Sequence, residues 1–382
     1  MSDVAVIGAG VVGLSTAYEL AGRGMTVRLF DQSQPGQEAS WAGAGMLPPG
    51  SPSAETTPEA KLRGASHSLW TDWAGGLLDE TGIDTGYRRC GSWELRRGGR
   101  ADELDAEIAA WRDEGVLVEP VVPRDLADRE AALSSDVTAA YRLPEFGQVR
   151  NPRLLKALIA GCLARGVRIH GGTAVFDLVT TNDRVRGVRT AQGDFEADHF
   201  LVAAGAWTGR LLGRLPHPPA VRPLRGQVVL LQQLPLPLTR VINVGLRYIV
   251  PRGDGRILVG STEEAVGFEK RNTAGAVAEL LAFAALYVPQ LERATLERTW
   301  SGLRPQSADG WPYLGRMPTF ANLWIAAGHF RAGLQLSPIT AVSLADLIVG
   351  DDPLVDLAPF APDREVKRAI WQPESCAAGD RD

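Results

Sequence analysis

The sequence predicts an α/β protein with two domains: a discontinuous Rossmann-like nucleotide-binding domain and a domain with a mostly antiparallel sheet. Three observations support this prediction. A glycine-rich turn, 8–13, lies between an apolar strand pattern and a helix pattern. Two further buried strands, 199–204 and 323–327, can extend the same parallel sheet. Residues 223–303 contain successive strand patterns, broken by turns such as Gly253-Asp-Gly255.

The first unit, residues 3–31, has the parts of a dinucleotide site. Gly8 permits a tight turn, Gly10 lets the backbone approach a pyrophosphate, and Gly13 lets the helix pack closely on the strand. The pyrophosphate would lie at the helix N-terminus. Asp31 ends the second strand, where it could accept hydrogen bonds from a ribose. The alternative, a glycine-rich turn of an ordinary α/β unit, leaves Asp31 unexplained.

The remaining elements follow from periodicity and from turn residues. Helical spacing is found at 57–80, 101–114, 154–165, 273–287 and 333–349. The pair Asn151-Pro152 predicts a cap and a first helical residue. Strand patterns cover 87–96, 167–170, 174–181, 184–190, 225–231, 248–251, 257–260 and 294–303. The predicted division is a nucleotide-binding domain at 1–86, 141–222 and 304–365, a substrate-binding domain at 87–140 and 223–303, and a polar tail at 366–382.

The composition excludes several classes of protein. At 382 residues the chain exceeds one usual core, which favours two domains. A net charge of −5 argues against a nucleic-acid partner, and no apolar run is long enough to span a membrane. Cys90, Cys162 and Cys376 form no close pair, which indicates a reducing compartment and no metal site. Because the N-terminus also lacks a signal peptide, we expect a cytoplasmic protein.

Four motifs carry a resemblance to a known family. They are Gly8-Ala-Gly-Val-Val-Gly13, Ala42-Gly-Ala-Gly-Met-Leu47, Trp300-Ser-Gly-Leu-Arg-Pro305 with Asp309-Gly-Trp-Pro-Tyr-Leu-Gly315, and Ala327-Gly-His-Phe-Arg-Ala-Gly333. The chain resembles the D-amino acid oxidase family of FAD-dependent oxidoreductases, and within it the glycine oxidase subgroup of the thiazole-biosynthesis type. Many flavoproteins share the first motif, whereas the last two motifs together are specific to a small group of proteins. The resemblance extends to about residue 350.

The resemblance implies FAD, and the lack of a second glycine fingerprint agrees with FAD rather than a nicotinamide cofactor. The implied FAD-binding residues are Gly8, Gly10, Val11, Val12, Gly13, Asp31, Gln32, Ala39, Ser40, Ala44, Gly45, Met46, Val175, Gly205, His329, Phe330, Arg331, Ala332, Gly333, Leu334 and Gln335. None of these segments contains a cysteine, so the FAD should be non-covalent. Trp41 stands where the family more often has a small residue, which leaves the fit of its loop open.

The end of the chain supports a flavin site on physical grounds as well. Gly333 opens the predicted final helix, whose N-terminal dipole would stabilise negative charge on a reduced flavin. The alternative is a helix N-terminus that simply packs against a strand.

A substrate carboxylate needs a cation, and arginine binds carboxylates bidentately. Arg304 follows a strand, Tyr248 can donate a second hydrogen bond, and the resemblance places Arg331 near both flavin and substrate. These three are the predicted catalytic residues, and Met46 and Glu263 join them in the predicted substrate site. The alternatives are strand packing for Tyr248, a buried salt bridge for Arg304 and a surface ion pair for Arg331.

Two positions depart from the pattern of the glycine oxidase subgroup. Leu246 stands where a histidine often precedes the tyrosine, and Glu263 stands where methionine is expected. A carboxylate at position 263 would make the site more polar and favour a cationic or bulkier amine. The alternative is that Glu263 points to solvent.

The resemblance implies oxidative deamination of glycine, sarcosine and small D-amino acids. Hydride would pass from Cα of a neutral amine to flavin N5, the imine would hydrolyse to a 2-oxo acid and ammonia or an amine, and oxygen would be reduced to hydrogen peroxide. This chemistry needs orientation and electrostatics rather than a nucleophile or a metal, and the sequence shows no Ser-His-Asp set. The resemblance also implies a homo-oligomer, with a tetramer as one form, and a role in thiamine (thiazole) biosynthesis.

Three other functions are compatible with a flavin fold. A quinone-linked D-amino acid dehydrogenase would need a membrane anchor, and no apolar or basic anchor is evident. A flavin-dependent tRNA-modifying module would need a basic surface, which the acidic net charge disfavours. A flavin-binding protein without catalysis would leave the pair Tyr248 and Arg304 unexplained.

Overall fold

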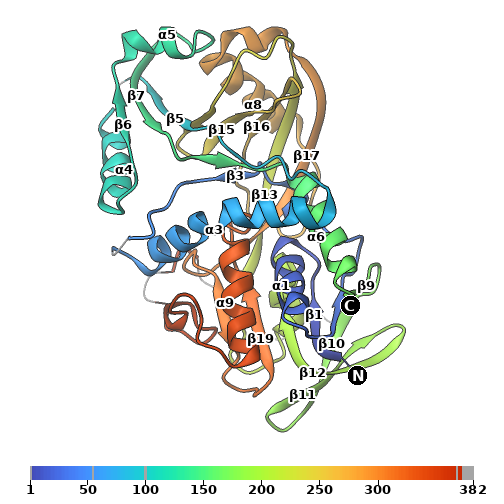
Figure 1. Cartoon of the computed structure of the whole chain (residues 1–382). Helices are drawn as coiled ribbons and strands as arrows, with labels where there is room; N and C mark the ends of the chain where they lie inside the picture. The colour runs from blue at the N-terminus through green and yellow to red at the C-terminus, as the bar shows by residue number, and fades with distance from the viewer. Residues whose placement is uncertain (1, 54–55, 99–100, 367–368, 372–382) are drawn as a thin grey trace.

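The computed structural model describes residues 2–53, 56–98, 101–366 and 369–371. Two large sheets lie one above the other, with helices between and around them (Figure 1). The prediction of an α/β fold with a mostly antiparallel second sheet is confirmed. Cys376 and nearly all of the predicted tail lie outside the described residues.

The lower sheet contains the predicted parallel strands. In the order in which they pair, these are β9 (Arg168–His170), β2 (Val27–Phe30), β1 (Ser2–Ile7), β12 (Gly193–Val202) and β19 (Leu323–Ala327). Three antiparallel strands extend it: β10 (Val175–Thr181), β11 (Arg184–Thr190) and β18 (Tyr313–Arg316). The long strand β12 therefore joins the parallel sheet to the β10–β11 hairpin. The sequence also predicts this hairpin.

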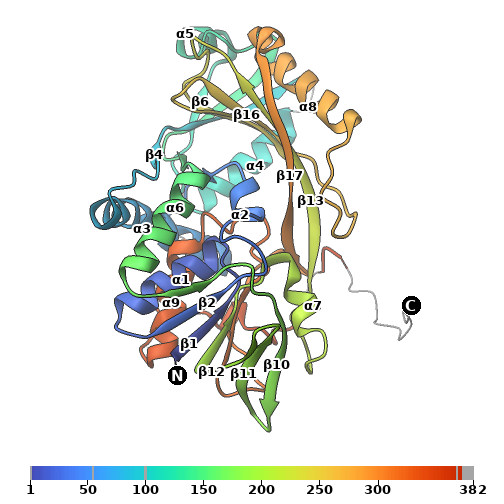
Figure 2. The same cartoon turned by 90° about the vertical axis from the view of Figure 1, so that its right-hand side faces the viewer.

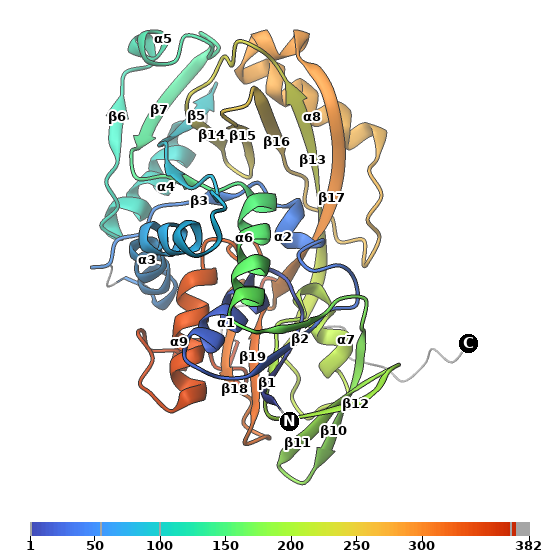
Figure 3. The same ribbon diagram turned by 45° about the vertical axis from the view of Figure 1, so that its right-hand side comes forward.

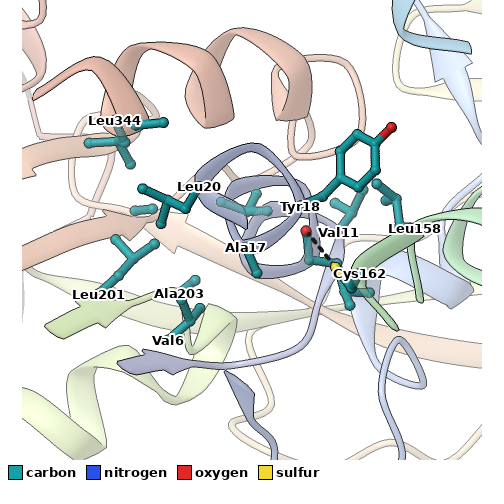
Figure 4. Packing of buried hydrophobic residues seen from close by; sticks show 14 of the residues in the cluster. Val6, Val11, Ala17, Tyr18, Leu20, Leu158, Cys162, Leu201, Ala203 and Leu344 are labelled. Carbon is teal, nitrogen blue, oxygen red and sulfur yellow. Dashed lines mark hydrogen bonds between the residues drawn. The ribbon is translucent and has the colours of Figure 1, made fainter. Parts of the chain in front are cut away.

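Four helices pack near or on one face of this sheet. They are α1 (Val11–Gly22), α3 (Pro58–Thr81), α6 (Asn151–Ala164) and α9 (Ser337–Val349). Helix α1 lies between α9 and α6, with Leu20 toward α9 and Tyr18 toward α6 (Figure 4). Leu14 and Leu20 are completely buried, so truncating either to alanine would cost about 2–5 kcal/mol. This core holds the N-terminus of α1 in place.

The upper sheet has eight strands and is antiparallel except where β14 meets β5. In order of pairing they are β17 (Thr295–Ser307), β13 (Val221–Gln232), β16 (Arg256–Gly260), β15 (Arg247–Pro251), β14 (Val241–Val244), β5 (Ser92–Arg97), β7 (Val137–Leu143) and β6 (Glu119–Val121). Its helices are α4 (Ala101–Asp113), α5 (Leu126–Arg129) and α8 (Ala274–Tyr287). The sequence analysis did not predict β6, β7, β14 or β18.

Strands β13 and β17 pair along their whole length and run down beside the lower sheet (Figure 2). Both are longer than the sequence patterns indicated, because polar and proline residues at their lower ends still continue the pairing, as Pro223 opposite Pro305 shows. The predicted domain boundaries at 222/223 and 303/304 fall inside these strands. The division into domains stays a prediction.

Several element ends differ from the predictions for local reasons. The predicted strand 87–96 is divided into β4 (Arg88–Arg89) and β5, with Gly91 between them at φ +73°. Strand β4 joins a small sheet with β3 (Met46–Leu47) and β8 (Gly147–Gln148). Helix α9 begins at Ser337 rather than Gly333, because Pro338 favours the first helical turn. Residues 333–336 form a turn ahead of it.

Two further short helices are α2 (Ala39–Ala42) and α7 (Thr208–Leu212). Helix α2 packs against β17 and α6 and so lies between the two sheets (Figure 3). Over the described residues, no helix is long and apolar enough to cross a bilayer. In the same part of the chain, no cluster of three or more His, Cys, Asp or Glu side chains is placed to hold a metal ion.

Candidate active site

Most of the predicted site residues line one cavity between the two sheets. Its empty volume, the open mouth included, is about 1310 Å³. The predicted FAD-binding residues in its wall are Gly10, Val11, Val12, Ala39, Ser40, Ala44, Gly45, Met46, Gly205, His329, Phe330, Arg331, Gly333 and Leu334. Tyr248 and Arg304 line the wall that the upper sheet provides. Asn243, Arg247 and Ser261 also line it, and the sequence analysis did not select them.

The glycine turn has the geometry that a dinucleotide site needs. Gly8 has φ +106°, and a Cβ atom on Gly13 would lie 1.9 Å from the Gly8 carbonyl oxygen. Asp31 accepts hydrogen bonds from the N–H groups of Ala9 and Ser33, both at 2.8 Å. Burial raises the pKa of Asp31, and these hydrogen bonds oppose that effect. The carboxylate is therefore held against the turn.

Other predicted FAD-binding residues lie outside the cavity wall. Gln32 is exposed, and Val175 packs at the start of β10. Gln335 donates a hydrogen bond to the Pro48 carbonyl at 2.7 Å, and its own carbonyl accepts from Trp70. The role of Gln335 visible here is to join α3 to the loop before α9.

The loop from Ala39 to Met46 is held by two residues that the sequence analysis did not assign to the site. The Asn151 amide donates to the carbonyls of Ser40 and Gly43, both at 2.8 Å. Arg252 donates to the Ala44 carbonyl at 2.5 Å. Burial lowers the pKa of Arg252 to about 9. The pair Asn151-Pro152 correctly indicated a helix start. Asn151, however, lies within the first turn of α6, and its side chain supports the loop instead of capping the helix.

Trp41 points away from this cavity. It lines a neighbouring one and packs edge-on against Trp300, with ring centroids 5.3 Å apart. The Trp300 indole N–H donates to the Ala42 carbonyl at 2.9 Å. A large residue at position 41 is therefore compatible with an open main cavity.

The segment from Gly328 to Leu334 is tied to the strand that carries Arg304. The Phe330 N–H donates to the Pro305 carbonyl at 2.9 Å, and Phe330 has φ +50°, which costs about 1 kcal/mol for a residue with a side chain. His329 is buried, and its Nε2 lies 3.1 Å from the Thr340 hydroxyl. Burial lowers the pKa of His329 to about 4, so the ring is neutral near pH 7.

Register across the upper sheet gives Tyr248 and Arg304 their positions. Tyr248 pairs with Gly260, and a Cβ atom there would lie 2.5 Å from its ring. Arg304 extends over Gly226 in the same way, with its guanidinium 2.3 Å from the position of a Cβ atom. Each large side chain therefore occupies a slot that a glycine leaves open on the neighbouring strand.

Arg304 is a desolvated cation without a carboxylate partner in the described residues. It donates to the Ser261 hydroxyl at 2.6 Å and to the Thr262 carbonyl at 3.1 Å, both neutral acceptors. Desolvation lowers its pKa, while the adjacent Tyr248 acts in the opposite direction. The alternative of a buried salt bridge is not found in this part of the chain, so Arg304 is free to pair with an anionic ligand.

Arg331 and Glu263 pair with each other. The Arg331 Nε lies 2.8 Å from Glu263 Oε1, and Arg331 Nη2 lies 2.5 Å from the same oxygen. The Arg331 side chain is 42 % exposed, so the alternative of a surface ion pair describes part of its environment. Leu246 is exposed at the turn before β15 and lines the same cavity.

These features fit a dinucleotide whose reactive end lies in the cavity. The glycine turn admits a close backbone approach, residues 39–45 line the cavity mostly with small side chains, and a desolvated cation lies in the opposite wall. This combination of Rossmann-like fold and substrate-sized cavity defines a dinucleotide-dependent oxidoreductase. The family model for FAD dependent oxidoreductases named DAO matches residues 3–347, and the chain belongs to that family.

Relatives and solved structures agree with this membership. The chain is 38 % identical to a glycine oxidase of Pseudomonas aeruginosa, with 94 % of this chain and 98 % of the relative covered. The crystal structure of glycine oxidase from Geobacillus kaustophilus matches with a TM-score of 0.91 and 35 % identity, covering 96 % of this chain and 99 % of that one. A bifunctional protein ThiO/ThiG of Trichormus variabilis is 37 % identical over 97 % of this chain and 56 % of its own length.

Proposed function

We propose that the chain is an FAD-dependent oxidase that deaminates glycine, sarcosine and small D-amino acids, with the FAD bound non-covalently. The observation that carries the proposal is the desolvated guanidinium of Arg304, which lies beside Tyr248 in the cavity and has no ion pair with any residue that the structure describes. Similarity to glycine oxidases over most of the chain supports the same activity. When bound, FAD would accept a hydride from the substrate and pass the electrons to oxygen.

The chain's own residues would bind and orient the substrate. Arg304 can hold the carboxylate, since its charge has no competing carboxylate within the described residues. The Tyr248 hydroxyl can donate to the same carboxylate, and Ser261 fixes the guanidinium from behind. Because Arg304 is partly buried and desolvated, this charge-assisted contact is stronger than it would be at the surface. Two fixed donors would orient the α-carbon relative to the opposite wall.

The cysteines support non-covalent binding. Neither Cys90 nor Cys162 lines the cavity. The Cys162 thiol is buried beneath α1 and donates to the Leu14 carbonyl at 3.4 Å (Figure 4). Burial raises the pKa of Cys162 to about 12, which leaves it a poor nucleophile. Acid precipitation should therefore release all the FAD into the supernatant.

The decisive experiment mixes the purified yellow protein anaerobically with glycine, sarcosine or D-alanine and follows the flavin absorbance. Bleaching, then rapid recovery in air with formation of peroxide, is the expected result. Bleaching without recovery would instead indicate a dehydrogenase of the quinone-linked type. Absence of bleaching with all three amines would overturn the proposal.

A cytoplasmic location, a homo-oligomer and a role in thiazole formation extend this proposal. The similarity to one half of a bifunctional protein ThiO/ThiG supports the third. Light scattering coupled to gel filtration would measure the oligomeric state. Deletion of the gene, followed by a test for growth that depends on added thiazole, would check the cellular role.

A further inference from the structure

We propose that the ion pair between Arg331 and Glu263 restricts the site to amines with a single carboxylate. The pair would do so by withholding Arg331 from a second carboxylate on the substrate. This inference rests on the proposed function and specifies its substrate class: monocarboxylic amines are accepted, and dicarboxylic amines are disfavoured.

The first step is the charge of the cavity wall. Its charged side chains, within the described chain, are three arginines, Arg247, Arg304 and Arg331. Arg247 pairs with Glu279 at 3.0 Å, and Arg331 pairs with Glu263. Among the described residues, Arg304 donates hydrogen bonds to neutral acceptors, and the Glu263 charge acts on it without a direct ion pair. The wall therefore offers one arginine that is outside an ion pair, which matches one carboxylate.

The second step is the geometry of the pair. Both Nε and Nη2 of Arg331 contact one oxygen of Glu263, so the Nε–Nη2 edge of the guanidinium, one of its two hydrogen-bonding edges, is occupied by that carboxylate. The Glu263 side chain is 25 % exposed, which leaves the pair less screened by solvent than a fully exposed one. A second substrate carboxylate would have to compete with Glu263 for this edge.

The third step is the rigidity of the segment that carries Glu263. The backbones of Glu264 and Arg225 exchange two hydrogen bonds, of 2.9 and 3.0 Å. The Glu264 side chain also pairs with buried Arg225 and accepts from Gln227 at 2.8 Å. On the other side, the Thr262 carbonyl accepts from Arg304. Glu263 is thus anchored through both of its neighbours and is poorly placed to follow Arg331 toward a ligand.

Neutralising Glu263 should therefore release Arg331 for a second carboxylate. Sarcosine and iminodiacetate form a matched pair of substrates, because iminodiacetate replaces one methyl hydrogen of sarcosine with a carboxylate. Acetate and succinate, which carry one and two carboxylates, serve as unreactive ligands. In the Glu263→Gln holoenzyme we expect the affinity for succinate relative to acetate to rise about 10-fold. The same ratio should rise for kcat/KM of iminodiacetate over sarcosine.

Titration of the flavin absorbance with acetate and succinate measures binding without turnover. Glu263→Met serves as a second variant of similar size. Glu145→Gln is the matched control, since Glu145 pairs with Arg89 at 2.8 Å and neither residue lines the cavity. Its affinity ratio should equal that of the wild type. Adding Arg331→Leu to Glu263→Gln should abolish the gain.

Two results would overturn the inference: a succinate-to-acetate ratio in both Glu263 variants within twofold of the wild type, or a gain that persists in the double variant. Failure of the proposed function would look different. In that case the wild type would not oxidise sarcosine, while the binding ratios would still report on the ion pair.

Discussion

The two walls of the cavity are built in different ways. The lower wall is made largely of backbone: residues 10–12 of the glycine turn and the loop after Ala39 expose small residues and main-chain groups. The upper wall is made of side chains on paired strands, and Tyr248 and Arg304 are among its polar groups. A site made of backbone is specified by a short stretch of sequence. A site made of side chains on a sheet depends on register between strands far apart in the chain.

This contrast predicts that the two walls can be disabled separately. Gly13→Ala should have the largest effect, because its Cβ would lie 1.9 Å from the Gly8 carbonyl oxygen and force α1 away from the turn. We expect a loss of about 100-fold or more in FAD affinity. Flavin content and titration of the apoprotein with FAD measure it. Gly75→Ala in α3 is the control, since a Cβ there contacts nothing within 4 Å; equal losses in both variants would contradict the argument.

Arg304→Leu should break the upper wall alone. We expect kcat/KM for sarcosine to fall about 30- to 100-fold, because the substrate carboxylate would then lack its cationic partner. FAD content should stay at that of the wild type. Steady-state kinetics with a flavin measurement on the same sample checks both points. Arg304→Lys should recover only part of the rate, since lysine cannot bind bidentately; a full recovery would argue against the proposed contact.

The ionisation of His329, in the lower wall, makes the free energy of unfolding depend on pH. Its pKa is about 4 in the folded chain and about 6.5 when unfolded, so the unfolded state binds more protons between these values. The stability that neutral His329 contributes is complete above pH 6.5 and is lost as the pH falls toward 4. Between pH 7 and pH 5 this loss is about 2 kcal/mol. Urea unfolding of the wild type and of His329→Gln should show the difference; parallel curves would refute it.

Tyr248→Phe should have the smallest effect. The ring would still fill the slot over Gly260, and only the hydroxyl would be lost. We expect kcat/KM to fall about 10-fold, the equivalent of one hydrogen bond to a charged group. Stability should not change. A loss as large as that of Arg304→Leu would mean that Tyr248 does more than donate one hydrogen bond.

The glycine turn of the lower wall gives local signals in the sequence, and its contact with FAD stays a prediction. The glycines of 8–13 and Asp31 lie within one β-α-β unit, and the structure places Asp31 directly against the turn. Asn151 and Arg252 were missed as supports of the loop after Ala39, because their hydrogen bonds cross more than 100 residues of sequence. No local pattern contains such contacts.

The ion pair between Arg331 and Glu263, which joins segments that follow the two sheets, shows more clearly what the sequence does not predict. The resemblance selected Tyr248, Arg304, Arg331 and Glu263 individually, but not the pairing of the last two, which lie 68 residues apart. Glu263 had two interpretations: a carboxylate that makes the site more polar, or a side chain that points to solvent. Neither interpretation includes an ion-pair partner. Its partial exposure and its ion pair come from how two loops meet, which only the fold determines.

The glycine slots under Tyr248 and Arg304 have an evolutionary consequence. Gly226 and Gly260 carry no side chain that could bind a ligand, yet a methyl group at either position would collide with the functional side chain that it accommodates. In descendants that abandon Arg304, selection on Gly226 should relax, and larger residues should fill the vacated space. Lineages that retain Arg304 should keep Gly226 unchanged. Co-variation between neighbouring strands would thus record when a member of this family stopped binding carboxylates.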